Sequence, residues 1–186
     1  IAETLNDYNT LPPIIIDPVM VSTSGSRLMQ QDAIETFKKE LMPMATLLTP
    51  NIAEAEVLSG CPIEDICSID SAAQMILSQN CNALLIKGGH LVEKTDRLYV
   101  KSERNGATLV ASYHHDTINS ANTHGTGCTL SSAIAALMAK GEKLEDAIRM
   151  AKEYVSEAIA KGAYINIGRG AGPVNHFFNP QKMIVR

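Results

Sequence analysis

The stretch that decides the fold is NTHGTGCTLSSAIAALMAKG, residues 122–141. Its second half has the spacing of an amphipathic helix, with apolar residues at i, i+4, i+7 and i+8: Leu130, Ile134, Leu137 and Met138. Gly141 is placed to end that helix in the left-handed conformation. A glycine-rich turn therefore leads directly into a buried helix, and the thiol of Cys128 stands at the junction.

This turn, made of Gly125, Thr126 and Gly127, is suited to binding an anion. The first N–H groups of a helix have no partner within the helix, and the helix dipole is positive at that end. Two glycines also let the backbone approach a ligand closely. We expect a pocket for a phosphate, or for charge that develops during a reaction, with the sulfur of Cys128 pointing at it. The alternative is that Cys128 is a small apolar filler in a tight turn, and the local features alone favour neither.

The composition is that of an ordinary globular chain. The 186 residues, 45% hydrophobic and 19% charged, are enough for one domain with a substantial core. A net charge of -4, a lack of basic runs and 4% aromatic residues argue against a nucleic-acid partner. No segment approaches the roughly 20 apolar residues of a membrane span, so we expect no membrane partner. The four cysteines have neither zinc-site nor disulfide spacing, and we expect a reducing cytoplasm.

Short apolar strands alternate with helices along the chain. Strands are predicted at residues 14–17, 46–49 and 83–86, and a hairpin is predicted from residues 97–100 and 108–113. The predicted helices are one around residues 33–41, one from Asn51 to Gly60, one capped by Ser68 or Asp70, the helix after the glycine turn, and one over residues 144–159. This alternation is typical of an α/β fold with a largely parallel central sheet flanked by helices, and we predict one domain over residues 1–186.

Polar residues follow three of the predicted strands. They are Asp17, Ser22, Thr23 and Ser24 after the first, Asn51 and Glu54 after the second, and Lys87 and His90 after the third. In open α/β sheets, ligands bind beyond the carboxyl ends of the strands. Carboxylates and an amide suit Mg²⁺, usually through water, whereas lysine and helix N–H groups suit phosphate. Together these groups predict phosphoryl transfer, in which positioning and charge neutralisation do most of the work.

Each polar feature also has a simpler interpretation. Asp17 precedes a proline and could initiate a turn. Asn51 could cap its helix, with Glu54 completing a capping box, which would not exclude a role at a metal. Lys87 could lie in a plain loop. We favour the functional interpretation because all of these features, together with the glycine turn, converge on one edge of the sheet.

The motifs together closely resemble those of the hydroxymethylpyrimidine and phosphomethylpyrimidine kinases, which belong to the ribokinase superfamily and serve thiamine biosynthesis. The resemblance rests on DPVMVSTSG, LLTPNIAEAEVLSG, LIKGGH, NTHGTGCTLSSAIAALMAKG and GPVNHFF, and it covers essentially the whole chain. Most sugar and nucleoside kinases of the superfamily have an aspartate base after the glycine turn. A cysteine there, Cys128 in this chain, marks the pyrimidine kinases and the related thiazole kinases.

The resemblance implies a role for each candidate residue. The turn residues Gly125, Thr126 and Gly127 would form the anion hole, and Cys128 would face the substrate hydroxymethyl group as the base. The residues near the nucleotide would be Asp17, Asn51, Lys87 and Thr123, and those near Mg²⁺ would be Asp17 and Glu54. The family phosphorylates 4-amino-5-hydroxymethyl-2-methylpyrimidine with ATP and Mg²⁺, and then converts the monophosphate to the diphosphate.

The chain departs from the family pattern in length. The family begins with a strand, a glycine-rich segment, helices and a small lid that provide much of the pyrimidine pocket, and we expect this N-terminal portion to be missing. We therefore expect weak binding of Mg-ATP, poor or no turnover by this chain alone, and association into a homodimer through an exposed sheet edge. The alternatives are a related vitamin kinase, for pyridoxal or hydroxyethylthiazole, and a non-catalytic nucleotide-binding fragment.

Overall fold

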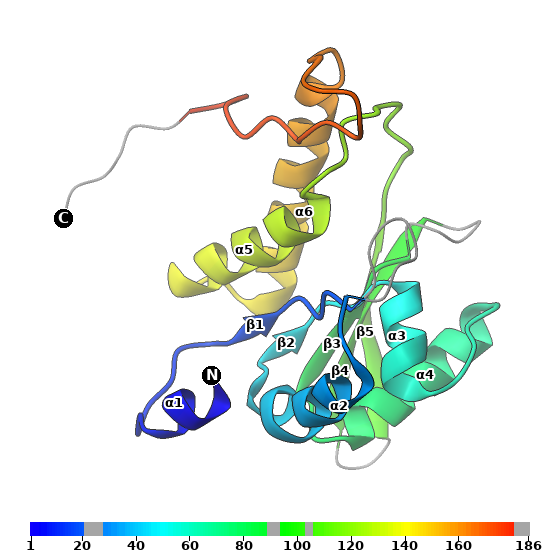
Figure 1. Ribbon diagram of the computed structural model, residues 1–186, viewed down its shortest axis with the longest axis vertical. Helices are drawn as coiled ribbons and strands as arrows, with labels where there is room; N and C mark the ends of the chain where they lie inside the picture. Colours follow the sequence, from blue (N-terminus) through cyan, green and yellow to red (C-terminus); the bar gives the residue numbers. More distant parts are fainter. Residues whose placement is uncertain (21–27, 89–93, 103–105, 181–186) are drawn as a thin grey trace. The chain divides into compact units, whose positions relative to one another are not determined.

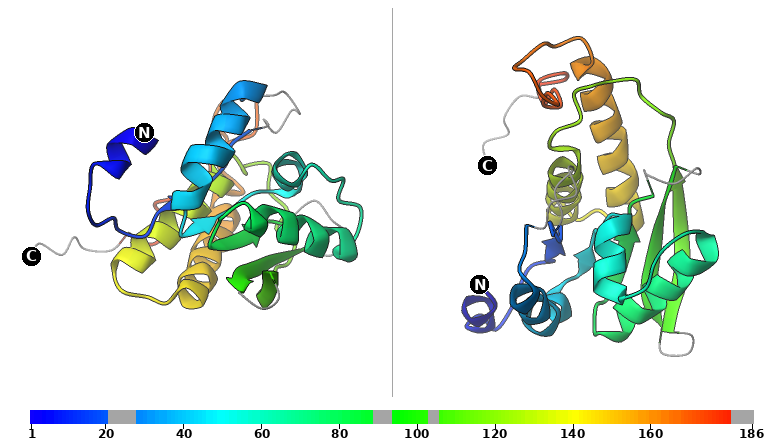
Figure 2. Two further views of the ribbon diagram at one scale, coloured as in Figure 1. Left: turned by 90° about the horizontal axis from the view of Figure 1, so that it is seen from below. Right: turned by 45° about the vertical axis from the view of Figure 1, so that its right-hand side comes forward.

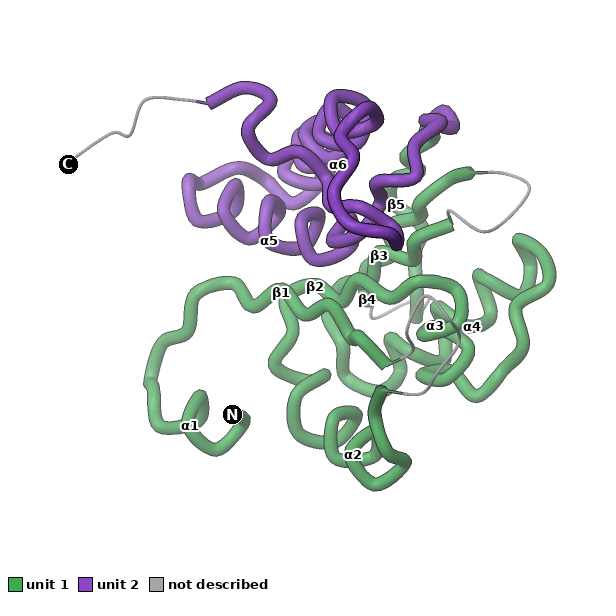
Figure 3. Tube along the Cα trace, turned by 45° about the horizontal axis from the view of Figure 1, so that its top comes forward, with its two compact units in different colours: residues 1–115 green, residues 116–186 purple. Residues whose placement is uncertain are grey.

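The computed structural model describes residues 1–20, 28–88, 94–102 and 106–180 (Figure 1). These residues form two compact units, Ile1–His115 and Asp116–Arg186, coloured separately in Figure 3. The predicted site residues Ser22, Thr23, Ser24 and His90 lie outside the described residues. Among the helices that the structure describes, none has both the length and the apolar character needed to cross a membrane.

The described part of unit 1 contains a five-stranded sheet with the strand order β1-β2-β3-β4-β5. The strands are β1 (Ile15–Ile16), β2 (Leu47–Leu48), β3 (Ala83–Ile86), β4 (Thr95–Ser102) and β5 (Gly106–His114). The first three are parallel, whereas β4 is antiparallel to both β3 and β5. The predicted α/β fold is confirmed, with the parallel part confined to β1–β3. The predicted hairpin is also confirmed, since it forms β4 and β5.

Helices connect the parallel strands of the sheet (Figure 2). Between β1 and β2 lie α2 (Gln31–Thr36), a π-helical turn η1 (Phe37–Leu41) and a 3₁₀ turn η2 (Met42–Met44). Between β2 and β3 lie α3 (Ile52–Ser59) and α4 (Ile66–Ser78), whereas α1 (Ala2–Asn6) precedes β1. The core of unit 1 is one apolar cluster contributed by α2, α3, α4 and strands β2, β3 and β4. All residues of β2 and β3 are buried, and Leu48, Leu84 and Ile86 lie in this cluster, so the residues that follow the two strands are held at fixed places.

Local signals set the ends of these helices. Helix α3 ends at Gly60, whose φ of 78° is left-handed, as predicted. The predicted cap of α4 at Ser68 or Asp70 is wrong, because Asp65 is the N-cap and its side chain accepts a hydrogen bond from the Ser68 N–H. The pattern Asp65-x-x-Ser68 is a reciprocal capping box, so the polar residue that looked like the cap is its partner one turn into the helix.

Unit 2 is built on two packed helices, α5 (Thr126–Ala139) and α6 (Leu144–Gly162). Gly141, with a φ of 95°, follows the end of α5 as the sequence predicts. The buried face of α6 includes Ile148, Ala151 and Val155, which confirms the predicted helical spacing. The segment after α6 returns to the residues before α5, where His124 and Pro173 form an isolated parallel bridge.

Truncating Leu84 should strongly destabilise unit 1. This side chain is 0% exposed, and its residue pairs with Leu48 on one side and Tyr99 on the other. We expect Leu84→Ala to lower the free energy of unfolding by about 3 kcal/mol in urea titrations. The matched control, Leu109→Ala on β5, removes a side chain that is 47% exposed and should change it by less than about 0.5 kcal/mol. Equal losses in the two variants would contradict the assigned core.

Candidate functional site

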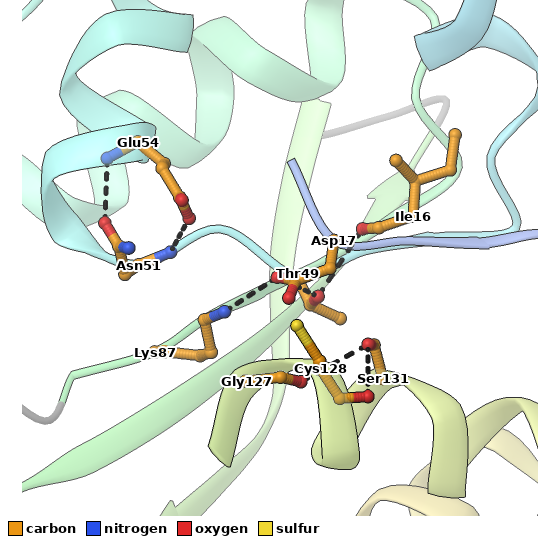
Figure 4. A network of polar contacts seen from close by, with 9 residues as sticks. All are labelled: Ile16, Asp17, Thr49, Asn51, Glu54, Lys87, Gly127, Cys128 and Ser131. Carbon is orange, nitrogen blue, oxygen red and sulfur yellow. Dashed lines mark hydrogen bonds and ion pairs between the residues drawn. The ribbon is translucent and has the colours of Figure 1, made fainter. Parts of the chain in front are cut away.

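Three polar residues stand at the carboxyl ends of the parallel strands. Asp17, Thr49 and Lys87 are the first residues after β1, β2 and β3, respectively. Lys87 Nζ lies 2.8 Å from Asp17 Oδ1, and the Thr49 hydroxyl donates to the same oxygen at 3.1 Å (Figure 4). Parallel pairing thus brings a cation and a carboxylate, distant in sequence, to the edge at which open α/β sheets bind ligands.

The Asp17–Lys87 ion pair is largely shielded from water. Its side chains are 12% and 18% exposed, respectively. Removing either partner of a shielded ion pair without a replacement destabilises the protein, because the remaining charge is uncompensated and poorly solvated. A ligand that carries both a negative and a positive group can replace the two partners together.

Thr49 is a functional candidate that the sequence reasoning missed. The sequence pattern places Thr49 within the predicted strand of residues 46–49, whereas β2 ends at Leu48. Its side chain is fully buried and its hydroxyl lies between the carbonyl oxygen of Ile16 and the carboxylate of Asp17. One sequence signal could have identified Thr49: it is a hydroxyl residue directly after two leucines. Its position relative to β2 is the same as that of Asp17 relative to β1.

Asn51 and Glu54 form a reciprocal capping box at the start of α3. Asn51 Oδ1 accepts from the Glu54 N–H at 2.9 Å, and Glu54 Oε2 accepts from the Asn51 N–H at 2.9 Å (Figure 4). The predicted cap is confirmed. Asn51 also forms a parallel bridge with Lys87, so the start of α3 and the end of β3 are held together.

The carboxyl group of Glu54 is buried, with the residue only 3% exposed. Burial raises its pKa above the ordinary value, and the negative charge of Asp17 acts in the same direction. The Asn51 N–H group and the charge of Lys87 oppose this shift. The negative charge of Asp17 thus disfavours the charged form of Glu54, and a cation held by both carboxylates would favour it.

The donors at this edge fit a magnesium ion better than a metal that needs a full protein cage. Within residues 1–20, 28–88, 94–102 and 106–180, no group of three or more His, Cys, Asp or Glu side chains is placed to hold a metal ion. Mg²⁺ usually takes one or two carboxylates and fills its other positions with water and phosphate oxygens. Asp17 and Glu54 supply such a pair, with the side-chain amide of Asn51 next to Glu54.

The predicted anion pocket of unit 2 has the backbone that such a pocket requires. Gly125 is the N-cap residue of α5, its φ of 87° is left-handed, and it has no side chain with which to satisfy the first N–H groups of the helix. The turn is held from within, because the Thr126 hydroxyl donates to the Thr123 carbonyl oxygen at 2.7 Å and the Thr129 hydroxyl donates to that of Gly125 at 2.7 Å.

Cys128 lies in the first turn of α5 and is exposed. This exposure does not fit the alternative of a buried apolar filler. Cys81 is the contrasting case, since it is buried and burial raises the pKa of its thiol to about 11. An exposed thiol at a helix N-terminus is available to a substrate, whereas a buried one is chemically inert.

A charged edge on parallel strands and a glycine turn at a helix N-terminus are together typical of α/β proteins that bind phosphate groups. The chain belongs to the phosphomethylpyrimidine kinase family, whose model matches residues 1–175. It is 43% identical over 166 residues to a hydroxymethylpyrimidine/phosphomethylpyrimidine kinase of Rhizobium meliloti, a match that covers 88% of this chain and 60% of the relative.

Two solved structures show the same fold. The phosphomethylpyrimidine kinase of Clostridium difficile 630 is 35% identical with a TM-score of 0.71, and the match covers 85% of this chain and 62% of that one. The pyridoxal kinase of Staphylococcus aureus in complex with AMP-PCP is 30% identical with a TM-score of 0.80, covering 96% and 63%. The fold is thus ribokinase-like, and the chain spans about six tenths of the length of these three proteins.

Replacing Glu54 by Gln should separate its charge from its capping role. Because the pKa of Glu54 is raised in the folded state, its contribution to stability is complete below the unfolded pKa of about 4.3 and is lost as the pH rises through the folded value. Gln retains the cap acceptor without the charge. Glu54→Gln should therefore gain stability relative to the wild type between pH 4 and 7.5, as measured by thermal unfolding.

The control is Glu54→Ala, which removes charge and cap together. It should be less stable than the Gln variant by about 1 kcal/mol across the same pH range. A difference between Glu54→Gln and the wild type that stays constant with pH would show that burial does not perturb this carboxyl group.

Proposed function

We propose that the protein is an ATP-dependent kinase that phosphorylates 4-amino-5-hydroxymethyl-2-methylpyrimidine and then its monophosphate, in thiamine biosynthesis. The observation that carries this proposal is Cys128, an exposed thiol directly after a left-handed glycine turn, in a chain of the phosphomethylpyrimidine kinase family. The names of the matched relatives support the pyrimidine substrate. The AMP-PCP complex of a similar pyridoxal kinase supports ATP as the phosphate donor.

In this proposal, the turn stabilises the phosphoryl group during transfer. The substrate hydroxyl oxygen forms a bond to the γ-phosphorus of ATP, the bond between that phosphorus and the β,γ-bridging oxygen breaks, and ADP leaves. Backbone N–H groups at Gly125, Thr126 and Gly127 would donate to the phosphoryl oxygens, where preorganised donors have their largest effect. The Thr126 N–H would exchange its 3.3 Å hydrogen bond to the Thr123 carbonyl oxygen for one to the phosphoryl group. The hydroxyl proton passes to the sulfur of Cys128. A mild base suffices because the transition state is loose and the proton leaves late.

The edge of unit 1 is assigned to the nucleotide phosphates and to magnesium. Lys87 and Asn51 would bind the nucleotide, and Asp17 and Glu54 would hold Mg²⁺. Thr123, which precedes the glycine turn of unit 2, stays a predicted nucleotide contact. The ion would neutralise phosphate charge and align the phosphate chain. Asp17 is the better direct ligand, since Glu54 is almost fully buried and already accepts from the Asn51 N–H, so Glu54 would act through water.

A second candidate, a pyridoxal kinase, is favoured by one observation. The S. aureus pyridoxal kinase matches with a TM-score of 0.80, against 0.71 for the C. difficile phosphomethylpyrimidine kinase. The sequence identities run the other way, 30% against 35%. We place the pyrimidine first because sequence identity bears on chemistry more directly than overall backbone similarity does. The predictions of a homodimer and of no nucleic-acid partner stay predictions.

Phosphate-transfer assays with both substrates and a cysteine pair of variants test this proposal in the intact enzyme, because we expect poor or no turnover by this chain alone. We expect faster transfer to the hydroxymethylpyrimidine and its monophosphate than to pyridoxal. Cys128→Ser should lower kcat by about 100-fold and leave the KM for ATP within about twofold, because a general base contributes to the chemical step rather than to nucleotide binding. The control, Cys67→Ser, changes another exposed cysteine and should match the wild type.

Each outcome is decisive for one part of the proposal. Preference for pyridoxal would replace the pyrimidine with the second candidate. A fully active Cys128→Ser variant between pH 6 and 9 would remove the base role. Turnover without added Mg²⁺ in the presence of a chelator would remove the metal.

A further inference from the structure

The motif GPVNHFF, residues 172–178, has no role in the mechanism above, yet the structure places its first residues beside the segment that enters the glycine turn. His124 N–H donates to the Gly172 carbonyl oxygen at 3.0 Å, and Val174 N–H donates to the His124 carbonyl oxygen at 3.3 Å. His124 and Pro173 form a parallel bridge. The backbone directly before Gly125 is therefore fixed by a segment about 50 residues later in the chain.

Asn122 joins this backbone to the end of α6. The residue is 6% exposed, and its side-chain Nδ2 donates to the carbonyl oxygens of Gly162 and Ile165, both at 2.6 Å. Both hydrogens of the amide are thus used, one on the last residue of α6 and the other on the segment that follows it. A buried amide with both hydrogens engaged has little freedom to move.

The backbone of Gly172 packs closely against the same side-chain amide of Asn122. A Cβ atom built on Gly172 would lie 1.9 Å from Asn122 Oδ1, so no larger residue fits there without moving Asn122. The neighbouring Gly170 has nothing within 4 Å of such an atom. Of these two glycines, close packing requires Gly172 to be glycine but leaves room for a side chain at Gly170.

We propose that Asn122 is a positioning residue that fixes the geometry of the turn at Gly125–Cys128. Only two residues separate Asn122 from Gly125, and the backbone of one of them, His124, is itself hydrogen-bonded on both sides. The turn therefore begins from an anchored point, which preorganises its N–H groups before a ligand arrives. The importance of this anchor for catalysis rests on the proposed function, whereas its effect on the turn does not.

Three variants and two readouts test this proposal. Asn122→Ala removes the anchor, Gly172→Ala displaces it, and Gly170→Ala is the matched control. The first readout is amide hydrogen exchange, which needs no activity. We expect exchange at residues 123–128 to rise at least tenfold in Asn122→Ala and Gly172→Ala, with the amides of β3 unchanged, and to match the wild type in Gly170→Ala.

The second readout is kinetic and is corrected for the folded fraction of each variant. A misplaced turn should lower kcat at least tenfold in Asn122→Ala and Gly172→Ala, with the KM for ATP within about twofold. A general loss of stability would instead raise exchange throughout the protein and leave kcat per folded molecule unchanged. Gly172→Ala retains every side chain of the anchor, so it tests the proposal even where Asn122→Ala folds poorly.

The outcomes separate this inference from the proposed function. Wild-type exchange at residues 123–128 in both variants overturns the anchor, as does a wild-type kcat in both variants when the wild type is active. If the wild type transfers no phosphate to any of the alcohols, the proposed function fails, and the exchange comparison alone decides whether Asn122 positions the turn.

Discussion

The ion pair between Asp17 and Lys87 is the interaction around which the carboxyl edge of the parallel strands is arranged. Its two atoms are 2.8 Å apart, just after β1 and β3, and Thr49, the residue after β2, donates to the same carboxylate. Water reaches neither partner freely, so each charge is stabilised mainly by the other. A phosphate chain bound with a cation can replace both partners together, because the phosphate can pair with Lys87 and the cation can pair with Asp17. Glu54 lies within reach of both charges: burial raises its pKa, the charge of Lys87 lowers it, and the charge of Asp17 raises it.

The phosphate site predicted in unit 2 depends on a different interaction, the hydrogen bonds of backbone N–H groups. The anion pocket predicted there would depend on backbone N–H groups at the start of α5, which follows the left-handed Gly125. Such a pocket is useful only if the backbone is held still, because flexible donors must be ordered at a cost in entropy when the ligand binds. The buried amide of Asn122 and the close approach of Gly172 supply that rigidity.

Much of this could be predicted because the signals are local. The left-handed glycines at Gly60 and Gly141 and the capping box of Asn51 and Glu54 each involve residues within a few positions of one another. The contacts that escaped prediction join distant residues. No local pattern shows that Gly172 must be glycine, since the reason is the side chain of Asn122, fifty positions earlier. The exact end of β2, and with it the role of Thr49, likewise depends on pairing with the neighbouring strands.

The central claim is that the carboxyl edge of β1–β3 receives nucleotide phosphates together with magnesium. Calorimetric titration of the folded protein with AMP-PCP, with and without Mg²⁺, tests it most directly, with Asp17→Asn as the comparison. The account predicts binding that strengthens at least tenfold on adding Mg²⁺ in the wild type, and a Mg²⁺ effect of less than about twofold in Asp17→Asn, because the metal ligand is lost. No binding by the folded wild type, or an equal Mg²⁺ effect in both proteins, would contradict it.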